Sequence, residues 1–541
     1  MRDMKHFCFF ITLVICCLTS ASLPAAARQQ VEQWDRYEFS HKAKVSGNPF
    51  DVEFSATFSH ADTSFTVHGF YAGNNVFKLR CMPIATGTWT FISHSSESAL
   101  DGLTGSFECI AAGKDNHGPV KVADQCHFRY ADGTRYYPIG TTSYDWMHIE
   151  GDNPEKTVAS LAQSGFNKLR MLLFVHNFDW DYPEPKLFPF EIKSKSTKAD
   201  GRMAYEWDFT RFNPAYFDMV EQRIDALMEI GVEADLILFH PYDEGRWGFD
   251  RMPFEVSLRY LDYITARLSS FRNIWWSLAN EFDNLRQQAP ENWMKFAERI
   301  NQRDPYKHLS SIHCSTARYF NPWSPYFTHC SAQDQAPVED HGRAATVRNI
   351  IQKPVIFDEV CYEGNMDNRW GSLSGQEMLY RMWQGIIAGT YVSHAECFMD
   401  GPNDYTHNFL ARGGEFQGES WKRIRFMRTI LEEMPHPLQL CDSSWDPYVS
   451  TAGHNYLMIY LGKNVLQEWT FDVPARNPAF PRIKEGTKLK VEIIDTWNMT
   501  VTDCPTVFEA HLERYRVYDK KHRSVRLPAS PYLLLRITEA E

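Results

Sequence analysis

From about residue 120 to residue 434 the chain alternates short apolar runs with amphipathic stretches, and this alternation restricts the fold more than any other feature. Strands are predicted at residues 137–144, 167–174, 233–240, 274–280, 309–314, 328–333, 355–359 and 390–396. Helices are predicted between them at residues 154–164, 214–230, 253–269, 290–301, 338–350, 375–388 and 418–433. Eight strands with intervening helices over about 300 residues are typical of a (β/α)8 TIM barrel. A doubly wound open sheet is the alternative, but no G-x-G-x-x-G motif follows the first strand to support it.

The segments on either side of this region have the period-two pattern of β-strands. Residues 28–119 contain short alternating runs at 50–54, 64–68, 76–80 and 87–91 and predict an immunoglobulin-like β-sandwich. Residues 435–541 return to strands at 456–461, 488–495 and 532–537 and predict a second β-sandwich. The sequence therefore predicts a multidomain chain in which a barrel over residues 120–434 lies between two β-sandwich domains, which either buttress the barrel or bind glycan.

The first 27 residues are predicted to be a signal peptide. Arg2 and Lys5 precede an apolar run over residues 7–18, and three alanines at 25–27 offer a cleavage site. A membrane-spanning helix needs about 20 apolar residues, which is longer than this run. Ile15 is too bulky for the usual lipobox before Cys16, so lipid attachment to a surface is only a weak alternative. We therefore expect a secreted or periplasmic protein.

Charge and cysteine usage exclude several classes of protein. Lys and Arg number 56 against 68 Asp and Glu, a net charge of −12, which argues against nucleic acid or an anionic membrane as a partner. The cysteines beyond the signal peptide lie at wide spacings without C-x-x-C, so neither a disulfide framework nor a zinc site is indicated. Cys81 and Cys109 lie on neighbouring predicted strands, and a disulfide between them is left open. No H-x-H or H-E-x-x-H spacing occurs, and we expect neither metal nor cofactor. The sequence does not indicate an oligomeric state.

Polar side chains follow the apolar runs of the predicted barrel strands. They are Asp145, Arg170, His240, Asn280 with Glu281, His313, Asp334, Asp358 with Glu359, and His394 with Glu396. In a barrel of this kind the catalytic groups lie at the carboxyl ends of the strands, whereas purely structural strand ends are more often turn residues. Three of these residues also have a structural interpretation. Arg170 can neutralise a buried carboxylate, and His240 and His313 can cap their strands.

Glu281 after the fourth strand and Glu359 after the seventh form the clearest pair. Two carboxylates at facing strand ends can cleave a glycosidic bond, one protonating the leaving oxygen and the other attacking the anomeric carbon. Carboxyl groups about 5 Å apart correspond to the retaining mechanism. The acid needs a raised pKa and the nucleophile a lowered one, and Arg170 is predicted to keep Glu359 ionised. Pairings that use one of three other carboxylates are the alternatives: Glu396, Asp358 and Glu363.

Asn280-Glu281 ending the fourth strand and Glu359 ending the seventh resemble the clan A retaining glycoside hydrolases. The resemblance implies that Glu281 is the acid/base, Asn280 the ligand of the sugar 2-hydroxyl and Glu359 the nucleophile. It also implies equatorial leaving bonds, such as β-D-glycosides or α-L-arabinosides.

The whole mature chain is similar to bacterial secreted glycosidases in which an apiosidase-like barrel lies between two β-sandwiches. Four stretches carry this similarity: residues 140–144, 239–243, 357–364 and 394–396. Many clan members have Trp at the end of the eighth strand, whereas this chain has His394-Ala395-Glu396, so the floor of the sugar site is expected to differ. Tyr144, Asp145 and Tyr242 complete the expected polar contacts to substrate.

Aromatic residues are abundant, with 16 Trp, 25 Tyr and 37 Phe, and several fall in the predicted loops. The loop over residues 176–213 is long enough to suggest a functional role. Exposed rings offer flat apolar faces on which sugars stack, although any one ring can equally serve to hold its loop in place. Four tryptophans are predicted to line a stacking groove: Trp180, Trp207, Trp247 and Trp370.

The sequence thus predicts a secreted retaining glycoside hydrolase that degrades an oligosaccharide or polysaccharide without a metal. The alternative is a carbohydrate-binding surface protein whose barrel has lost turnover. Joint presence of Glu281 and Glu359 favours the enzyme, because a pure binder has no need of both.

Overall fold

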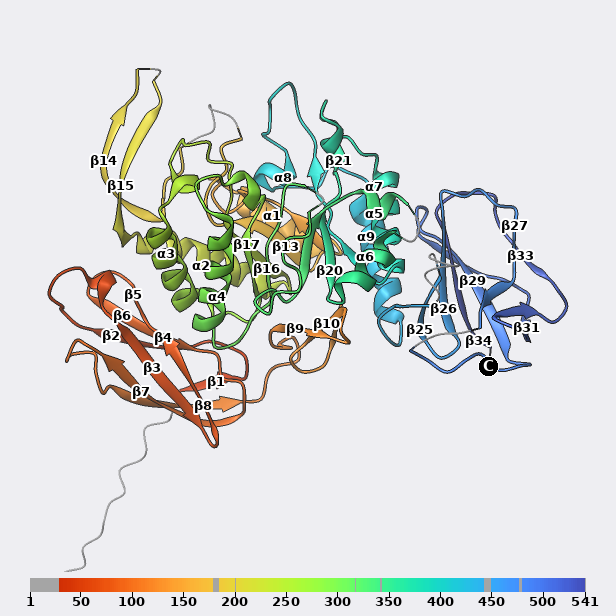
Figure 1. Cartoon of the computed structure of the whole chain (residues 1–541), viewed down its shortest axis with the longest axis horizontal. Coiled ribbons are helices and arrows are strands. Elements are labelled where there is room, and N and C mark those ends of the chain that lie inside the picture. Colours follow the sequence, from red (N-terminus) through yellow and green to blue (C-terminus); the bar gives the residue numbers. More distant parts are fainter. Residues whose placement is uncertain are drawn as a thin grey trace, which may run out of the picture.

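The computed structural model describes residues 29–540 except 179–183, 200, 317, 341–342, 442–448 and 476–478. The predicted signal peptide lies outside these ranges. Figure 1 shows a β-rich N-terminal part in red and orange, a central part of strands and helices, and a β-rich C-terminal part in blue. The chain therefore has a central barrel domain with β-rich domains on either side of it, as expected in outline.

The N-terminal part consists of two sheets that share one core. The strands are β1 (Gln30–Glu32), β2 (Tyr37–Lys42), β3 (Phe54–His60), β4 (Thr63–His68), β5 (Phe70–Tyr71), β6 (Val76–Cys81), β7 (Gly87–Ser95) and β8 (Thr104–Ile110). Their orders are β1-β8-β7-β3-β4 and β2-β6-β5. Alternate residues of both sheets, such as Phe58, Leu79 and Trp89, are buried between them. Cys81 and Cys109 are both free buried thiols, so the disulfide left open by the sequence is not formed.

The strand predicted at residues 50–54 is wrong. Residues Pro49–Asp51 form the 3-10 helix η1, and β3 begins only at Phe54. Asn48 explains the difference, because its side-chain oxygen accepts a hydrogen bond from the Phe50 N–H and Pro49 occupies the first helical position.

Eight parallel strands form the wall of the central domain: β12 (Gly140–Thr142), β13 (Lys168–Leu172), β16 (Glu233–Phe239), β17 (Ile274–Ala279), β18 (Ser310–Ser311), β19 (Cys330–Gln333), β20 (Val355–Glu359) and β22 (Tyr391–Val392). They pair in the orders β12-β13-β16-β17-β18 and β19-β20-β22. A parallel bridge between Thr141 and His394 joins the first strand to the end of the last, and the Thr328 N–H donates to the Ser310 carbonyl between the two sheets at 2.8 Å. The strand predictions of the sequence are confirmed here within a few residues at each end.

Helices cover the outside of this wall in Figure 1. They are α1 (Asn153–Gln163), α2 (Pro214–Glu229), α3 (Phe254–Leu268), α4 (Pro290–Arg303), α5 (Ala336–Glu339), α6 (Arg343–Ile351), α7 (Gly375–Ile387) and α9 (Ser420–Glu433). The short α8 (Phe409–Arg412) lies instead at the carboxyl ends of the strands, where the Tyr144 N–H donates to its Leu410 carbonyl. The helix predicted at 338–350 is two helices, α5 and α6. A small sheet of β9 (Val120–Ala123), β10 (His127–Tyr130) and β11 (Arg135–Tyr136) packs at the amino ends of the strands, where Phe128 and Tyr136 contact Trp275.

The long segment after β13 is not an irregular loop. It contains a projecting antiparallel hairpin, β14 (Phe190–Thr197) and β15 (Met203–Phe212), drawn in yellow in Figure 1. Most residues of β14 are exposed, so the strand lacks the buried alternation by which a strand is recognised in a sequence.

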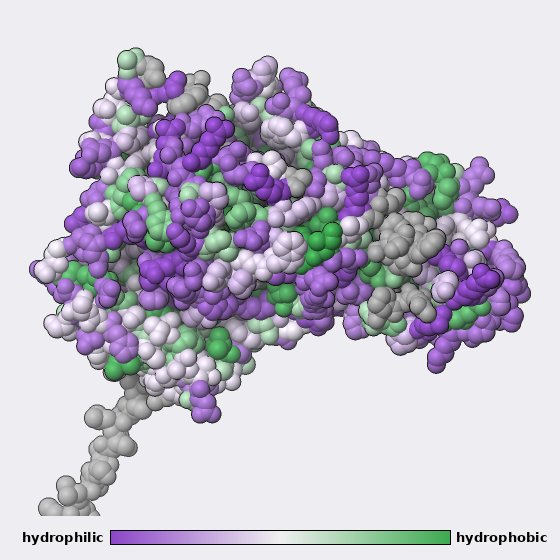
Figure 2. Space-filling model, in the orientation of Figure 1, coloured by the Kyte–Doolittle hydropathy of each residue, from purple (hydrophilic) through white to green (hydrophobic). Residues whose placement is uncertain are grey.

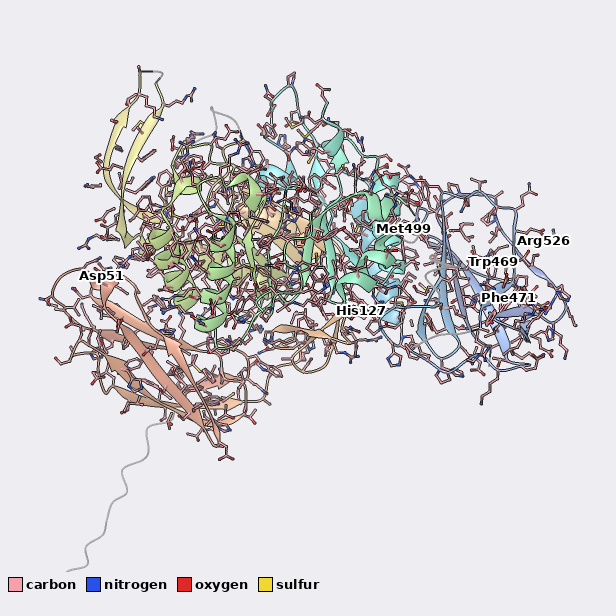
Figure 3. All side chains as sticks on the ribbon, viewed as in Figure 1. Asp51, His127, Trp469, Phe471, Met499 and Arg526 are labelled. Carbon is pink, nitrogen blue, oxygen red and sulfur yellow. The ribbon has the colours of Figure 1, made fainter. Side chains whose placement is uncertain are left out.

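The C-terminal part is a nine-stranded sheet with a separate two-stranded one. Its strands are β24 (Gln439–Leu440), β25 (Val449–Gly453), β26 (Tyr456–Gly462), β27 (Glu468–Thr470), β28 (Asp472–Pro474), β29 (Lys488–Asp495), β30 (Thr500–Asp503), β31 (Phe508–Glu513), β32 (Arg516–Asp519), β33 (Ser524–Arg526) and β34 (Leu533–Glu539). Figure 3 labels Trp469 and Phe471 in this part, and Phe471 stacks on Phe508 at 4.7 Å in its core.

Polar contacts join the flanking parts to the barrel helices. Arg80 of β6 donates two hydrogen bonds to Glu221 of α2, at 2.8 and 2.9 Å, and both side chains are buried. On the other side, Lys463 pairs with Glu377 of α7 at 2.6 Å. Figure 2 shows a mostly hydrophilic face with small scattered apolar patches. Among the described helices, none combines the length and the hydropathy needed to cross a bilayer.

Candidate active site

A pocket of about 520 Å³ opens at the carboxyl ends of the barrel strands. Its lining comes from the segments that follow most of these strands: Tyr144, His176, Phe178, Tyr242, Glu281, Gln333, Asp334, Gln335, Glu359, Cys361, Tyr362, Trp370, Tyr405, Asn408 and Leu410. Glu281 and Glu359 therefore face one cavity. A larger hollow of about 830 Å³ lies between the N-terminal strands and α3, but it is remote from the strand ends that carry these carboxylates.

Glu281 and Cys361 both hold a left-handed backbone conformation at this edge. Their φ angles are 44° and 67°, and neither is a glycine. Such a conformation costs of order 1–3 kcal/mol in a residue with a Cβ and is concentrated at functional sites. At Glu281 it directs the chain from the end of β17 into the 3-10 helix η3 (Phe282–Asn284), so that the carboxylate turns towards the pocket.

Glu359 is the last residue of β20 and is held by three polar groups. Its Oε1 accepts hydrogen bonds from the Tyr144 hydroxyl at 3.0 Å and from Arg170 Nη1 at 3.2 Å, and His313 Nε2 lies at 3.4 Å. Burial by itself raises the pKa of Glu359, but these neighbours outweigh it and the pKa lies below its usual value. Burial lowers the pKa of His313 to about 4, so that ring is neutral near pH 7 and the permanent positive charge beside Glu359 is Arg170.

Glu281 lies in a different electrostatic environment. Burial, together with the negative charge of Glu359, raises the pKa of Glu281 to about 7. Asn284 Nδ2 donates a hydrogen bond to its Oε2 at 3.2 Å, and none of the described lysines or arginines forms an ion pair with it. The two pocket carboxylates therefore have unequal proton affinities: Glu359 is ionised near pH 7, whereas Glu281 still holds a proton in about half of the molecules at that pH.

Asn280 connects the residues around Glu359 into one network. Arg170 Nη2 donates to Asn280 Oδ1, while Asn280 Nδ2 donates to the hydroxyls of Tyr144, at 3.3 Å, and Tyr242. Asn280 is fully buried, and the two tyrosines line the pocket. Arg170 and Asn280 thus act from beneath the pocket wall and orient Tyr144 and Tyr242 within it.

A second ionic cluster lies one layer deeper in the barrel. Lys168 Nζ contacts Asp235 at 2.7 Å and Asp358 at 3.0 Å, and Asp358 also accepts hydrogen bonds from Ser331 and Ser393. Both carboxylate oxygens of Asp358 are occupied by these bonds, and Asp358 does not line the pocket. Asp358 is therefore placed as a structural group, and Lys168, two residues before Arg170 on the same strand, is a site neighbour that our sequence reasoning missed. The spacing of two between these cations on one strand was the available signal.

Several predicted site residues lie outside the pocket lining. Asp145 is fully buried and accepts from the His176 N–H, and His240 bonds the Phe174 carbonyl and the Tyr242 N–H. His394 and Glu396 are fully buried behind the pocket. Trp207 and Trp247 are buried against each other at the base of the β14–β15 hairpin, where Trp207 Nε1 donates to the Trp247 carbonyl.

Among the predicted tryptophans, Trp370 lies at the pocket and is 42% exposed, whereas Trp180 falls outside the described residues. Seven further lining residues were not singled out from the sequence as contacts to substrate: His176, Gln333, Gln335, Cys361, Tyr405, Asn408 and Leu410. No motif marks them, because it is the fold that brings them to this edge.

Known proteins share both the sequence pattern and this architecture. Residues 123–394 match the family described as "Apiosidase-like, catalytic domain". The chain belongs to this apiosidase-like family. Residues 30–96 and 445–538 of the apiosidase-like protein match two domains of unknown function, DUF5060 and DUF5605. None of the curated proteins matches it significantly.

The apiosidase-like protein also resembles solved structures. A candidate glycoside hydrolase from Bacteroides vulgatus ATCC 8482 is 50% identical, with 95% of this chain and 100% of that chain covered and a TM-score of 0.92. A family 5 glycoside hydrolase from the same strain shares the fold at 14% identity, with 78% and 93% covered and a TM-score of 0.54. Another glycoside hydrolase, at 14% identity and a TM-score of 0.55, covers 78% and 97%. The predicted kinship with glycosidases is confirmed by these matches.

Proposed function

We propose that the apiosidase-like protein is an exported, retaining glycoside hydrolase that acts on an oligosaccharide or polysaccharide. In this proposal the barrel is a closed (β/α)8 TIM barrel over residues 120–434. The N-terminal immunoglobulin-like sandwich spans residues 28–119, the C-terminal sandwich spans residues 435–541, and residues 1–27 are removed as a signal peptide. Export is supported by the charged start, apolar run and alanine-rich end of that leader.

In the first step a carboxylate oxygen of Glu359 attacks the anomeric carbon of the bound sugar. The bond from that carbon to the leaving oxygen breaks as Glu281 gives its proton to this oxygen, and a glycosyl ester forms on Glu359. In the second step Glu281 removes a proton from water, the resulting oxygen attacks the anomeric carbon, and the ester bond breaks. The sugar leaves with the same anomeric configuration, and both carboxyl groups return to their starting states.

The unequal proton affinities of the two carboxyl groups carry this proposal. Arg170 and the Tyr144 hydroxyl keep Glu359 ionised and ready to attack, whereas burial raises the pKa of Glu281 to about 7, so that Glu281 holds a proton up to about that pH. Once Glu359 is an ester it carries no charge, so the pKa of Glu281 falls and this residue becomes a base for the second step. One pair of side chains can therefore act as acid and then as base.

The aromatic walls support a sugar as the substrate. Trp370, Tyr362 and Tyr405 line the same pocket as the carboxylates and offer faces to sugar C–H groups. The alternative, a carbohydrate-binding protein without turnover, needs the rings but not the opposed ionisation states of Glu281 and Glu359.

The experiment replaces each carboxylate singly by its amide, with Glu291→Gln, an exposed glutamate of α4, as the matched control. The purified protein is first tested against aryl glycosides and glycans, including apiosides because of the family's description. Glu281→Gln and Glu359→Gln should each lose at least about a thousandfold in kcat/KM on an unactivated glycoside while folding normally. A 2-deoxy-2-fluoro glycoside should leave a covalent adduct on Glu359. Full turnover in both variants, or binding without turnover in the wild type, would refute the proposal.

A further inference from the structure

Three ionisable side chains gather behind the pocket wall and take no part in the proposed chemistry. Glu363 of β21 (Glu363–Gly364), His394, and Glu396 of β23 (Glu396–Cys397) each offer a ligand atom, and these atoms lie within 4.8 Å of one another. The three side chains are 3%, 0% and 1% exposed. The parallel pairing of β21 with β23 places Glu363 opposite Glu396, so the backbone itself sets the cluster.

Two atoms of this cluster lack hydrogen-bond partners in the described part of the chain. They are His394 Nε2 and Glu396 Oε1, and they lie 3.8 Å apart. A buried polar atom without a partner costs about 1–3 kcal/mol, more for a charged group. Two carboxylates share this space, and among the described residues no lysine or arginine forms an ion pair with either of them. The cluster as it stands therefore lacks a positive charge and a partner for two lone pairs.

The other ring nitrogen of His394 and the other carboxylate oxygens are held by hydrogen bonds to surrounding groups, as is usual for residues that bind a metal ion. His394 Nδ1 bonds Thr141 Oγ1 at 3.0 Å, which leaves the Nε2 lone pair directed at Glu396. Glu396 Oε2 accepts from the Gln417 and Gly418 N–H groups, and Glu363 accepts from Glu419 and Ser420.

Gly418 keeps the space between the carboxylates open. A Cβ at this position would lie 2.6 Å from Glu363 Oε2 and 2.7 Å from Glu396 Oε1. The backbone at residue 418 is not in the left-handed region, so space and not conformation requires the glycine.

We propose that Glu363, His394 and Glu396 bind one structural divalent metal ion, for which zinc is the best match. An imidazole nitrogen with carboxylate oxygens is a common zinc ligand set, and two ligands of a tetrahedral zinc are about 3.4 Å apart, close to the 3.8 Å between His394 and Glu396. Full burial assigns the ion a structural role. It would tie β21 to the end of the eighth strand, and β21 follows directly on Tyr362, whose N–H donates to the Trp370 carbonyl at 2.7 Å. The ion would thus hold the aromatic wall of the pocket, whatever reaction that pocket performs.

The test compares the wild type with Glu396→Gln, which preserves the shape of the side chain but weakens its ligand oxygen. His407→Ala is the control, because exposed His407 pairs with Asp400 at 2.7 Å and could bind zinc adventitiously. Untagged protein is dialysed against zinc, desalted and measured by mass spectrometry for metal content. Wild type and His407→Ala should each retain about one zinc per chain, and Glu396→Gln at least tenfold less. A chelator should lower the Tm of wild type by several degrees and leave that of Glu396→Gln unchanged.

A second measurement covers the case in which Glu396→Gln does not fold. Cobalt(II) added to chelated wild-type protein should produce the visible absorption of a protein-bound ion and restore the Tm. Wild-type protein that retains less than a tenth of an equivalent, and that neither metal stabilises, would overturn the proposal. Equal zinc in wild type and Glu396→Gln would overturn it as well. If metal-free Glu396→Gln then also has a higher Tm than metal-free wild type, a proton on Glu396, and not a metal ion, lies between Glu396 and His394.

Discussion

Replacing Tyr144 by phenylalanine should raise the pKa of the Glu359 carboxyl group without emptying the pocket. The Tyr144 hydroxyl donates a hydrogen bond of 3.0 Å to Glu359 Oε1, and phenylalanine retains the ring that lines the cavity. A hydrogen bond to a charged group contributes about 1.5–3 kcal/mol, and about 1.4 kcal/mol corresponds to one pKa unit. The pKa of Glu359 should therefore rise by about one to two units.

The assay is the pH dependence of kcat/KM for an aryl glycoside that the wild type hydrolyses. This quantity reports the ionisation of the free enzyme, and its acid limb follows Glu359, which must be ionised to attack. The acid limb of Tyr144→Phe should move to higher pH by the same one to two units, while the basic limb moves little. Arg170 remains beside the carboxylate, so the variant should still be active near pH 7.

Tyr362→Phe is the matched control for this variant. Tyr362 lines the same pocket and is buried, but its hydroxyl has no hydrogen-bond partner in the described part of the chain. Its removal should leave the acid limb in place. An unmoved acid limb in Tyr144→Phe, or equal movement in both variants, would show that the hydroxyl does not stabilise the charge on Glu359 and would refute the reasoning.

Three other perturbations test separate parts of the structure. Glu281 must be protonated to assist the leaving group and its pKa is about 7, so kcat/KM should decline above about pH 7. In Glu281→Gln the residual hydrolysis of an activated glycoside should no longer show this decline. A decline that is unchanged in the variant would show that another group causes it. Trp370→Ala should raise KM about two- to tenfold with little change in Tm, whereas Trp247→Ala should cost about 3–5 kcal/mol of stability, measured by urea unfolding. Burial raises the pKa of Glu233 to about 8, so its contribution to stability is present below about pH 4.5 and is lost as the pH rises through about 8. Glu233→Gln should therefore raise the Tm at pH 9 but not at pH 4. An equal change in Tm at both pH values would contradict this.

The strands and the carboxylate pair were predictable because both follow from local patterns. Residues 355–359 read as a short apolar run that ends in two acids, and the strand ends at Glu359 as predicted. The order of strands along the chain then placed Glu281 and Glu359 at the same edge, since parallel strands share their carboxyl ends.

Contacts made across the chain were not predictable in this way. Trp207 and Trp247 look like loop residues, and only the folding of the β14–β15 hairpin against the loop after β16 buries them. His394 and Glu396 were not predictable either. Because they follow the eighth strand, the sequence predicts that they face the pocket. Their side chains instead lie behind its wall, where the β21–β23 pairing and the start of α9 enclose them.

Arg170 has a further consequence for variants that lack the Glu359 side chain. The guanidinium is fully buried and its charge is permanent, so truncation to Glu359→Gly removes its ion-pair partner at the base of a cavity open to solvent. The space left by the deleted side chain is also bordered by the Tyr144 hydroxyl and the neutral ring of His313, and it should bind a small anion. Azide or formate held there would occupy the position of the missing carboxylate, and the inactive variant would become an enzyme whose nucleophile is supplied from the buffer.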